Sequence, residues 1–142
     1  MKYTFSQHAR RLGFRSGLEE TVANQLNRLA LPFEYEAKEK RITYEKPATK
    51  HKYSPDFTFT NSPIIIETKG YFKTADRKKH LLIKEQYPDI DLRFVFGNSN
   101  TRISKQSKTT YAAWCIKHGF KYADKEIPPD WIKEIKHGTT RN

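Results

Sequence analysis

Cysteine, acidic side chains and long apolar runs are all scarce in this chain of 142 residues. The one cysteine, Cys115, excludes an intrachain disulfide and a cysteine-based zinc cluster. No apolar run approaches the length of a membrane span, and the first residues lack the apolar core of a signal peptide. We therefore expect a protein of the cytoplasm with no membrane partner.

Acidic residues are outnumbered by basic ones. The chain has 27 Lys and Arg against 16 Asp and Glu, a net charge of +11, which predicts a polyanionic partner and most simply nucleic acid. An anionic membrane surface is the alternative, but no basic amphipathic helix stands out. A glycine-rich phosphate-binding loop is also missing from the sequence, and we expect no small-molecule substrate.

The stretch from Tyr53 to Gly70 predicts a β-hairpin. Residues 53–60 alternate aromatic and polar side chains, which is the period of a half-buried strand. Asn-Ser-Pro at 61–63 is turn chemistry, and three isoleucines at 64–66 begin a second strand that ends at Gly70.

Two carboxylates and a lysine lie on this hairpin. Glu67 and Lys69 are two residues apart and share one face of a strand, while Asp56 lies on the neighbouring strand. A carboxylate beside three isoleucines is costly unless a cation compensates it, and hard oxygen ligands suit Mg²⁺ or Mn²⁺. A structural Glu–Lys pair on an exposed face is the alternative. The order Pro-Asp, turn, apolar run and Glu-x-Lys resembles the PD-(D/E)xK nuclease motif and favours a nuclease.

A helix is expected from Ser16 to the residues before Pro32. Ser16 and Glu19 match a capping box, and the apolar stripe consists of Leu18, Val22, Leu26 and Leu29. Glu19 borders this stripe, so a capping role and a metal-site role are both open for it. Glu20 points about 100° further round the helix and is expected to be solvated.

The remaining pattern is that of a mixed α/β domain. Short strands are expected at 33–37, 41–45, 91–96 and 120–123. Helices are expected at about 75–86, at 109–118 with Gly119 as its stop, and at 128–135.

Basic residues outside the hairpin are candidates for phosphate contacts. The helix after the hairpin carries Arg77, Lys78, Lys79 and His80, and the polar loop at 97–108 carries Lys105. Arg15 belongs to a basic segment near the amino terminus. Solvated surface is the alternative for each of them.

Six segments in order carry a resemblance to a known family. They are Phe14–Glu19, Phe33–Glu36, Ser54–Phe57, Glu67–Gly70, Asp76–Ile83 and Ala123–Pro128. Together they resemble the phage endonuclease I family of Holliday-junction resolvases, within the PD-(D/E)xK superfamily, from about Phe14 to Lys136.

The resemblance implies a fold and an assembly. The chain length predicts one domain over residues 1–142, in which residues 1–14 are expected to be a basic arm that the resemblance does not cover. The resemblance implies that this nuclease domain has a restriction-endonuclease-like mixed β-sheet flanked by helices. It also implies a domain-swapped homodimer, in which a connector at 46–52 passes the amino-terminal segment to the partner. If a phage encodes the chain, it acts on branched DNA in the host cytoplasm.

The resemblance also implies a mechanism. The catalytic set is Glu19, Asp56, Glu67 and Lys69, with two Mg²⁺ or Mn²⁺ ions per active site. Asp56, Glu67 and the Thr68 carbonyl hold one ion, Glu19 and Asp56 share the other, and Lys69 orients the attacking water. Hydrolysis leaves a 5′-phosphate and a 3′-hydroxyl.

Two other functions would also fit the strongly basic composition of the chain. A sequence-specific restriction or repair endonuclease would have the same core but would cut linear duplex. A non-catalytic nucleic-acid-binding module would have no need for Asp56, Glu67 and Lys69 together.

Overall fold

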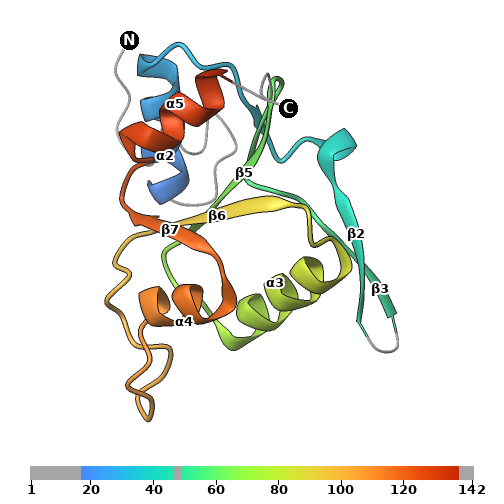
Figure 1. Ribbon diagram of the computed structural model, residues 1–142, viewed down its shortest axis with the longest axis vertical. Helices are drawn as coiled ribbons and strands as arrows, with labels where there is room; N and C mark the ends of the chain where they lie inside the picture. The colour runs from blue at the N-terminus through green and yellow to red at the C-terminus, as the bar shows by residue number, and fades with distance from the viewer. Residues whose placement is uncertain (1–16, 47–48, 138–142) are drawn as a thin grey trace.

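A mixed β-sheet lies between two pairs of helices (Figure 1). The computed structural model describes residues 17–46 and 49–137. The sheet order is β1 (Glu34–Tyr35), β4 (Phe57–Phe59), β5 (Ser62–Lys69), β6 (Asp91–Phe96) and β7 (Lys121–Asp124). β1, β4 and β5 pair antiparallel, whereas β5, β6 and β7 pair parallel. This confirms the expected mixed sheet flanked by helices.

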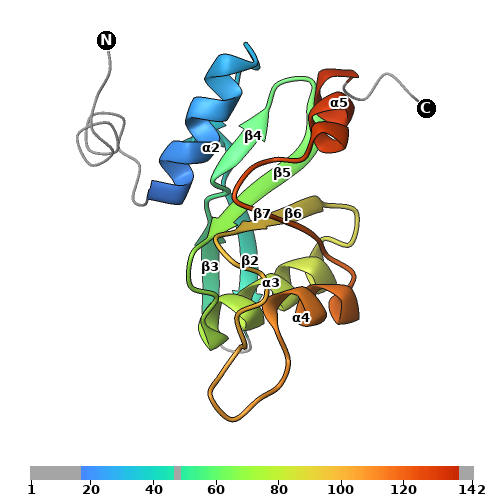
Figure 2. The same cartoon turned by 90° about the vertical axis from the view of Figure 1, so that its left-hand side faces the viewer.

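The helices cover the sheet in pairs (Figures 1 and 2). α2 (Gly17–Arg28) and α5 (Pro129–His137) lie over one face, and α3 (Thr74–Gln86) and α4 (Tyr111–His118) lie over the other. None of the described helices is long and apolar enough to span a bilayer.

Alternation along the inner strands builds one hydrophobic core on each face. Ile64 and Ile66 of β5 pack beneath α2 and α5, whereas Ile65 between them faces the opposite core. In β6, Phe94 and Phe96 join the α3 and α4 core. Successive strand residues point to opposite faces, so unbroken apolar runs suit strands buried on both sides.

A second, two-stranded sheet lies beside α3 (Figure 1). It pairs β2 (Ile42–Lys46) with β3 (Thr49–Tyr53), after a 3₁₀ turn η1 (Lys38–Lys40). The Glu45 amide donates to the Gln86 side chain at 2.8 Å, and Gln86 donates back to the Glu45 carbonyl at 2.7 Å. The expected connector at 46–52 therefore runs through a hairpin that is fastened to α3; residues 47–48 lie outside the described residues.

The expected strand over 53–60 is wrong in its extent. Tyr53 ends β3, residues 54–56 belong to no strand, and only residues 57–59 form β4. Pro55 has no amide proton and cannot donate to a strand ladder. The chain therefore changes sheets at Pro55 and places Asp56 at the corner.

The other elements lie close to their expected positions. Thr110 caps α4 by accepting a hydrogen bond from the Ala113 amide at 3.0 Å. Gly119 ends that helix as expected, with a φ of 77° that favours glycine. Ser16, the expected cap of α2, and the basic arm lie outside the described residues.

Arg93 of β6 is fully buried, which the sequence pattern did not indicate. Its guanidinium donates to both Asp91 oxygens at 2.9 Å and to Glu134 of α5 at 2.8 and 3.0 Å. It also lies 5.3 Å from the centroid of the Trp131 ring. Burial acts to lower the pKa of Arg93, but the hydrogen bonds to Glu134 and Asp91 outweigh burial and raise it. Arg93 therefore remains charged and fastens α5 to the sheet.

Replacing Arg93 is expected to destabilise the protein strongly. Arg93→Ala removes a buried cation and leaves two carboxylates facing each other, at a cost of about 3 kcal/mol. Arg28→Ala is the matched control, because its ion pair with Glu126 is exposed and contributes about 0.5 kcal/mol or less. Urea unfolding measures both, and equal effects would contradict this role for Arg93.

Candidate active site

Strand pairing brings three carboxylate positions side by side at one end of the sheet. Phe57 of β4 pairs with both β1 and β5. One residue further along each pairing are Glu36, Asp56 and Glu67. Two hydrogen bonds confirm this alignment: the Glu36 amide donates to the Asp56 carbonyl at 3.2 Å, and the Asp56 amide donates to Oε1 of Glu67 at 3.4 Å.

The first turn of α2 adds a fourth carboxylate. One carboxylate oxygen from each of Glu19, Glu36 and Asp56 lies within 4.8 Å of the others. Glu19 and Asp56 are almost fully buried. The structure thus brings Glu19 and Asp56 together within a single chain, whereas the exchange that the resemblance implies would bring them together from two chains. Three oxygen donors so close together match the chemistry that hard divalent cations require.

Glu36 is the site residue that sequence reasoning missed. The alternating residues at 33–37 predict a strand that includes Glu36. In the structure β1 ends at Tyr35, and Glu36 adopts a φ of 47°. That left-handed conformation is uncommon outside glycine and often occurs at functional sites. The turn of the backbone at this residue places the Glu36 carboxylate beside Asp56. Residue periodicity does not reveal such a turn.

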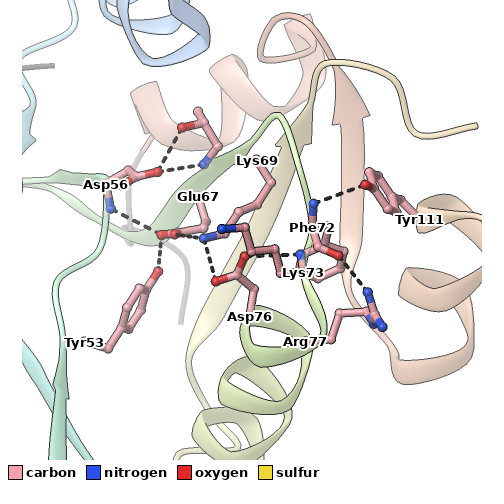
Figure 3. Close-up of polar contacts among 10 residues, drawn as sticks. Tyr53, Asp56, Glu67, Lys69, Phe72, Lys73, Asp76, Arg77 and Tyr111 are labelled. Carbon is pink, nitrogen blue, oxygen red and sulfur yellow. Dashed lines mark hydrogen bonds and ion pairs between the residues drawn. The ribbon is translucent and has the colours of Figure 1, made fainter. Parts of the chain in front are cut away.

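Glu67 and Lys69 form an ion pair next to the carboxylate cluster (Figure 3). Lys69 Nζ lies 3.2 Å from Oε2 of Glu67 and 3.6 Å from Oδ1 of Asp76, at the start of α3. The Tyr53 hydroxyl donates to Oε1 of Glu67. Because Glu67 is only 3% exposed, the alternative of an ion pair on an exposed strand face is wrong.

Thr68 orients Asp56 from the opposite strand. Its amide and its hydroxyl both donate to Oδ2 of Asp56, each at 2.9 Å. Two donors on one oxygen hold the carboxylate in a single orientation. The expected metal contact of the Thr68 carbonyl remains a prediction.

The site concentrates negative charge where water is excluded. Burial raises the pKa of Asp56 well above its usual range, and the Glu67 and Glu19 carboxylates raise it further, although the hydrogen bonds from Thr68 oppose the rise. Burial acts to lower the pKa of Lys69, but Glu67, Asp76 and Asp56 together raise it. Lys69 is therefore a firmly held cation, whereas the raised pKa of Asp56 shows that this carboxylate resists ionisation despite Lys69.

His80 does not face solvent, so its expected phosphate contact is wrong. It is 1% exposed and packs edge to face against Tyr53 and Phe94, with ring centroids 5.1 and 5.0 Å away. Burial lowers its pKa well below the usual value, and the nearby Lys69 and Lys79 lower it further. His80 is thus a neutral core residue behind the Tyr53 ring.

Glu20 was expected to be solvated, and this is wrong because it is 2% exposed. The sequence predicts that the buried face of this helix includes Leu18 and Leu29, but both are only partly buried. The buried face is instead turned toward Ala23, one helical turn after Glu20. Both glutamates lie near the amino end of α2, where the helix dipole favours negative charge.

The other expected DNA contacts are distributed around the protein. Lys78 and Lys105 are exposed, and Lys79 lies 5.3 Å from the centroid of the Tyr53 ring. Arg77 is half-buried and donates to the Phe72 carbonyl at 2.7 Å, which stabilises the start of α3 (Figure 3). Arg15 lies outside the described residues. A DNA contact stays a prediction for each of these five residues.

A buried carboxylate cluster beside a lysine, on a strongly basic protein, is typical of nucleases. Comparison with known proteins makes the assignment specific. A model of the phage endonuclease I family matches residues 1–141, and the chain belongs to this family.

Two relatives cover most of the chain. It is similar to Endonuclease I of Escherichia phage T7, with 52% identity over 123 residues, which is 87% of this chain and 80% of that protein. It is also similar to Endodeoxyribonuclease 1 of Enterobacteria phage T3, with 50% identity over 123 residues, which is 87% of this chain and 79% of that protein.

Removing one charge from the cluster is expected to stabilise the metal-free fold. Asp56→Asn keeps an oxygen for the two Thr68 donors and adds an amide that can donate to neighbouring carboxylates. We expect a gain of about 1–2 kcal/mol near neutral pH in EDTA. The raised pKa of Asp56 means that the folded wild type binds a proton that the unfolded chain has released. The contribution of Asp56 to the free energy of unfolding of the wild type therefore falls as the pH rises from about 4 toward neutrality. Asp56→Asn should not show this decrease.

Urea unfolding across this pH range measures the difference. Thr58→Val tests a neighbouring buried position that carries no charge. If Asp56→Asn were less stable than the wild type at neutral pH, this would contradict repulsion between Asp56 and its neighbouring carboxylates.

Proposed function

We propose that the chain is a structure-selective DNA endonuclease that resolves four-way junctions and other branched DNA. The observation that carries this proposal is the meeting of Glu19, Glu36 and Asp56 within 4.8 Å, beside the Glu67–Lys69 pair. Membership of the phage endonuclease I family supports it, as do the names of the relatives from phages T7 and T3. A phage-encoded enzyme of this kind acts in the host cytoplasm.

The carboxylates suit two Mg²⁺ or Mn²⁺ ions. Asp56 with Glu67 and the Thr68 carbonyl would hold one ion, and Asp56 with Glu19 would share the second, to which Glu36 adds a further oxygen. Bound ions of this type lower the pKa of water and stabilise the leaving oxygen of a phosphodiester. Such a pair of sites accounts for burying carboxylates whose repulsion otherwise opposes folding.

The protein groups around the carboxylates position the reactants. Lys69 remains protonated, so its ammonium can orient a water molecule and offset charge that develops on the phosphate. Tyr53 and Lys69 bind different oxygens of Glu67 and fix the orientation of that carboxylate. Hydrolysis in this arrangement leaves a 5′-phosphate and a 3′-hydroxyl.

Binding should rest on charge and shape. The net charge of +11 favours phosphate contacts, for which the exposed Lys78 and Lys105 are candidates together with Arg15, Arg77 and Lys79. None of the elements described over residues 17–46 and 49–137 resembles a base-reading helix motif, which favours recognition of the branch over recognition of a sequence.

A homodimer supplies the two cuts that a two-fold symmetric junction needs. In the single chain, β2 folds back on β3 and Glu19 meets its own Asp56. Opening this hairpin at the connector would extend the chain and carry α2 to a partner, so that the same contacts form between subunits. Exchange of an identical element is a low-cost route to a dimer. The restriction-endonuclease-like fold and the exchanged dimer are both part of this proposal.

Cleavage is expected to depend on the metal and on the branch. A purified four-way junction should be cut near the branch point with Mg²⁺ and stay intact in EDTA, and an equal-length linear duplex should be cut poorly. Lys69→Ala should slow cleavage by about 100-fold or more, while junction binding survives because most affinity comes from phosphate contacts elsewhere. Cleavage that persists in EDTA would contradict the metal sites. Equal cutting of linear duplex at one sequence would support the restriction or repair alternative.

Mixed dimers test whether sites are shared between subunits. A Glu19→Gln chain is co-folded with a Lys69→Ala chain, and the heterodimer is isolated with two affinity tags. Sites composed of both chains leave one site intact and place both lesions in the other. The heterodimer should then nick one strand of a junction without completing its resolution.

The two homodimers are the controls, and both should be inactive under either arrangement. A heterodimer that binds junctions but cuts neither strand would contradict exchange. Glu19 would then serve Asp56 of its own chain, as in the closed hairpin. Because Glu20 is buried, Glu20→Gln is a poor neutral control, and Glu39→Gln on exposed η1 is better suited.

A further inference from the structure

A pocket of about 380 Å³ lies at the end of β5, directly after Lys69. The two residues that follow β5 and the loop between β6 and α4 form its walls. Its lining includes Gly70, Tyr71, Thr101, Arg102, Ser104 and Lys105. The volume suits a small planar group, since ligand pockets in proteins start at about 300 Å³.

Tyr71 is an unusual residue to find on this surface. It is 68% exposed, although large aromatic side chains mostly pack into cores. The neighbouring Phe72 is fully buried and anchors the segment in the α3 and α4 core. The ammonium of Lys73 lies 5.8 Å from the centroid of the Tyr71 ring. The chain therefore holds an aromatic ring at the surface, flanked by positive charge.

The opposite wall of the pocket is held by hydrogen bonds. The Tyr111 amide donates to the Thr101 carbonyl at 2.9 Å, and the Ile103 amide donates to the Thr109 carbonyl at 2.8 Å. The Tyr111 hydroxyl in turn accepts from the Phe72 amide at 3.2 Å, which joins the loop to the segment that carries Tyr71 (Figure 3). Both walls are thus fixed to each other and to α4, so the pocket is largely preformed.

Resting on the proposed function, we propose that this pocket receives an unstacked nucleobase from the branch point of the DNA substrate. The base stacks on Tyr71, and Arg102 and Lys105 contact the adjoining phosphates. Every base has a π face, so stacking on an aromatic side chain tolerates any sequence. Arginine and lysine supply the charge that follows a nucleic-acid backbone.

The position of the pocket matches a nucleotide next to the scissile phosphate. Tyr71 is two residues from Lys69, which corresponds to at most about 7 Å of extended chain. DNA rises about 3.4 Å per nucleotide along one strand, so a base on Tyr71 would belong to a nucleotide a few steps from a phosphate held at Lys69. In intact duplex that base is stacked and paired, and extracting it costs a few kcal/mol. At a branch point or mismatch much of this cost is already met, so the pocket selects branched DNA.

The test pairs changes in the protein with changes in the DNA. Dissociation constants are measured by fluorescence anisotropy in EDTA, where binding is separated from cleavage. Tyr71→Ala is combined with junctions that carry one abasic nucleotide at each of the positions flanking the cut. Tyr71→Ala alone should weaken junction binding about tenfold, and so should one abasic position alone. When the abasic nucleotide is the one that stacks on Tyr71, adding Tyr71→Ala should weaken binding no further. At every other position the effect of Tyr71→Ala and that of the abasic nucleotide should multiply.

Matched variants separate stacking from charge and from loss of folding. Tyr71→Trp should bind as the wild type does. Ile116→Ala, at an equally exposed apolar position on α4, should have no effect. Arg102→Gln and Lys105→Gln should each reduce the slope of log affinity against log salt by about 1, while Tyr71→Ala leaves that slope unchanged.

The outcomes are distinct. Normal junction binding by Tyr71→Ala, or multiplicative effects at every abasic position, would contradict the binding of a base in this pocket. The proposed endonuclease function would not be affected by that result. A wild-type protein that neither binds nor cuts branched DNA would overturn the proposed function and this inference with it.

Discussion

Repulsion among buried carboxylates is the constraint around which this structure is built. Asp56 shares its surroundings with Glu19, Glu36 and Glu67. Burial raises its pKa well above the usual range and the Glu67 and Glu19 carboxylates raise it further, so an ionised Asp56 is costly here. Each neighbouring polar contact offsets part of that cost. Thr68 donates twice to Asp56, while Tyr53 and Lys69 bind the two oxygens of Glu67. A fold that served stability alone would place apolar residues here, so the cluster points to chemistry.

The rest of the fold holds the cluster in place despite its repulsion. Arg93 binds Glu134 and so fastens α5 to β6. The side chain of Gln25 then joins α2 to the segment that leads into α5, because it donates to the Ile127 carbonyl and accepts from the Ile127 amide, both at 2.8 Å. Glu19 lies on the same helix as Gln25. The ion pair of the buried Arg93 with Glu134 therefore contributes to the position of Glu19 in the site.

Residue pattern predicted the parts of this site that lie close together in sequence. Pro-Asp, the isoleucine run and Glu-x-Lys specified the hairpin and brought Asp56 to Glu67 and Lys69. Glu36 was missed because a left-handed backbone turns it toward Asp56, and sequence periodicity describes only regular elements.

Burial of polar residues was the other source of error. His80 sits in a run of cations that is typical of a solvated helix face, yet the rings of Tyr53 and Phe94 enclose it. Glu20 is buried because α2 docks through a face turned toward Ala23. Both outcomes depend on how a helix packs against distant segments, which local spacing does not encode.

Binding of Mn²⁺ to the protein without DNA tests the central claim most directly. Electron paramagnetic resonance follows the free ion, and a pH indicator follows released protons. We predict saturable binding that releases protons, since a cation competes with the proton whose binding the raised pKa of Asp56 favours. Asp56→Asn should abolish most of this binding, and Glu36→Gln should weaken it. Wild-type protein that binds no Mn²⁺ above the level of Asp56→Asn would contradict the assignment of these carboxylates to a metal site.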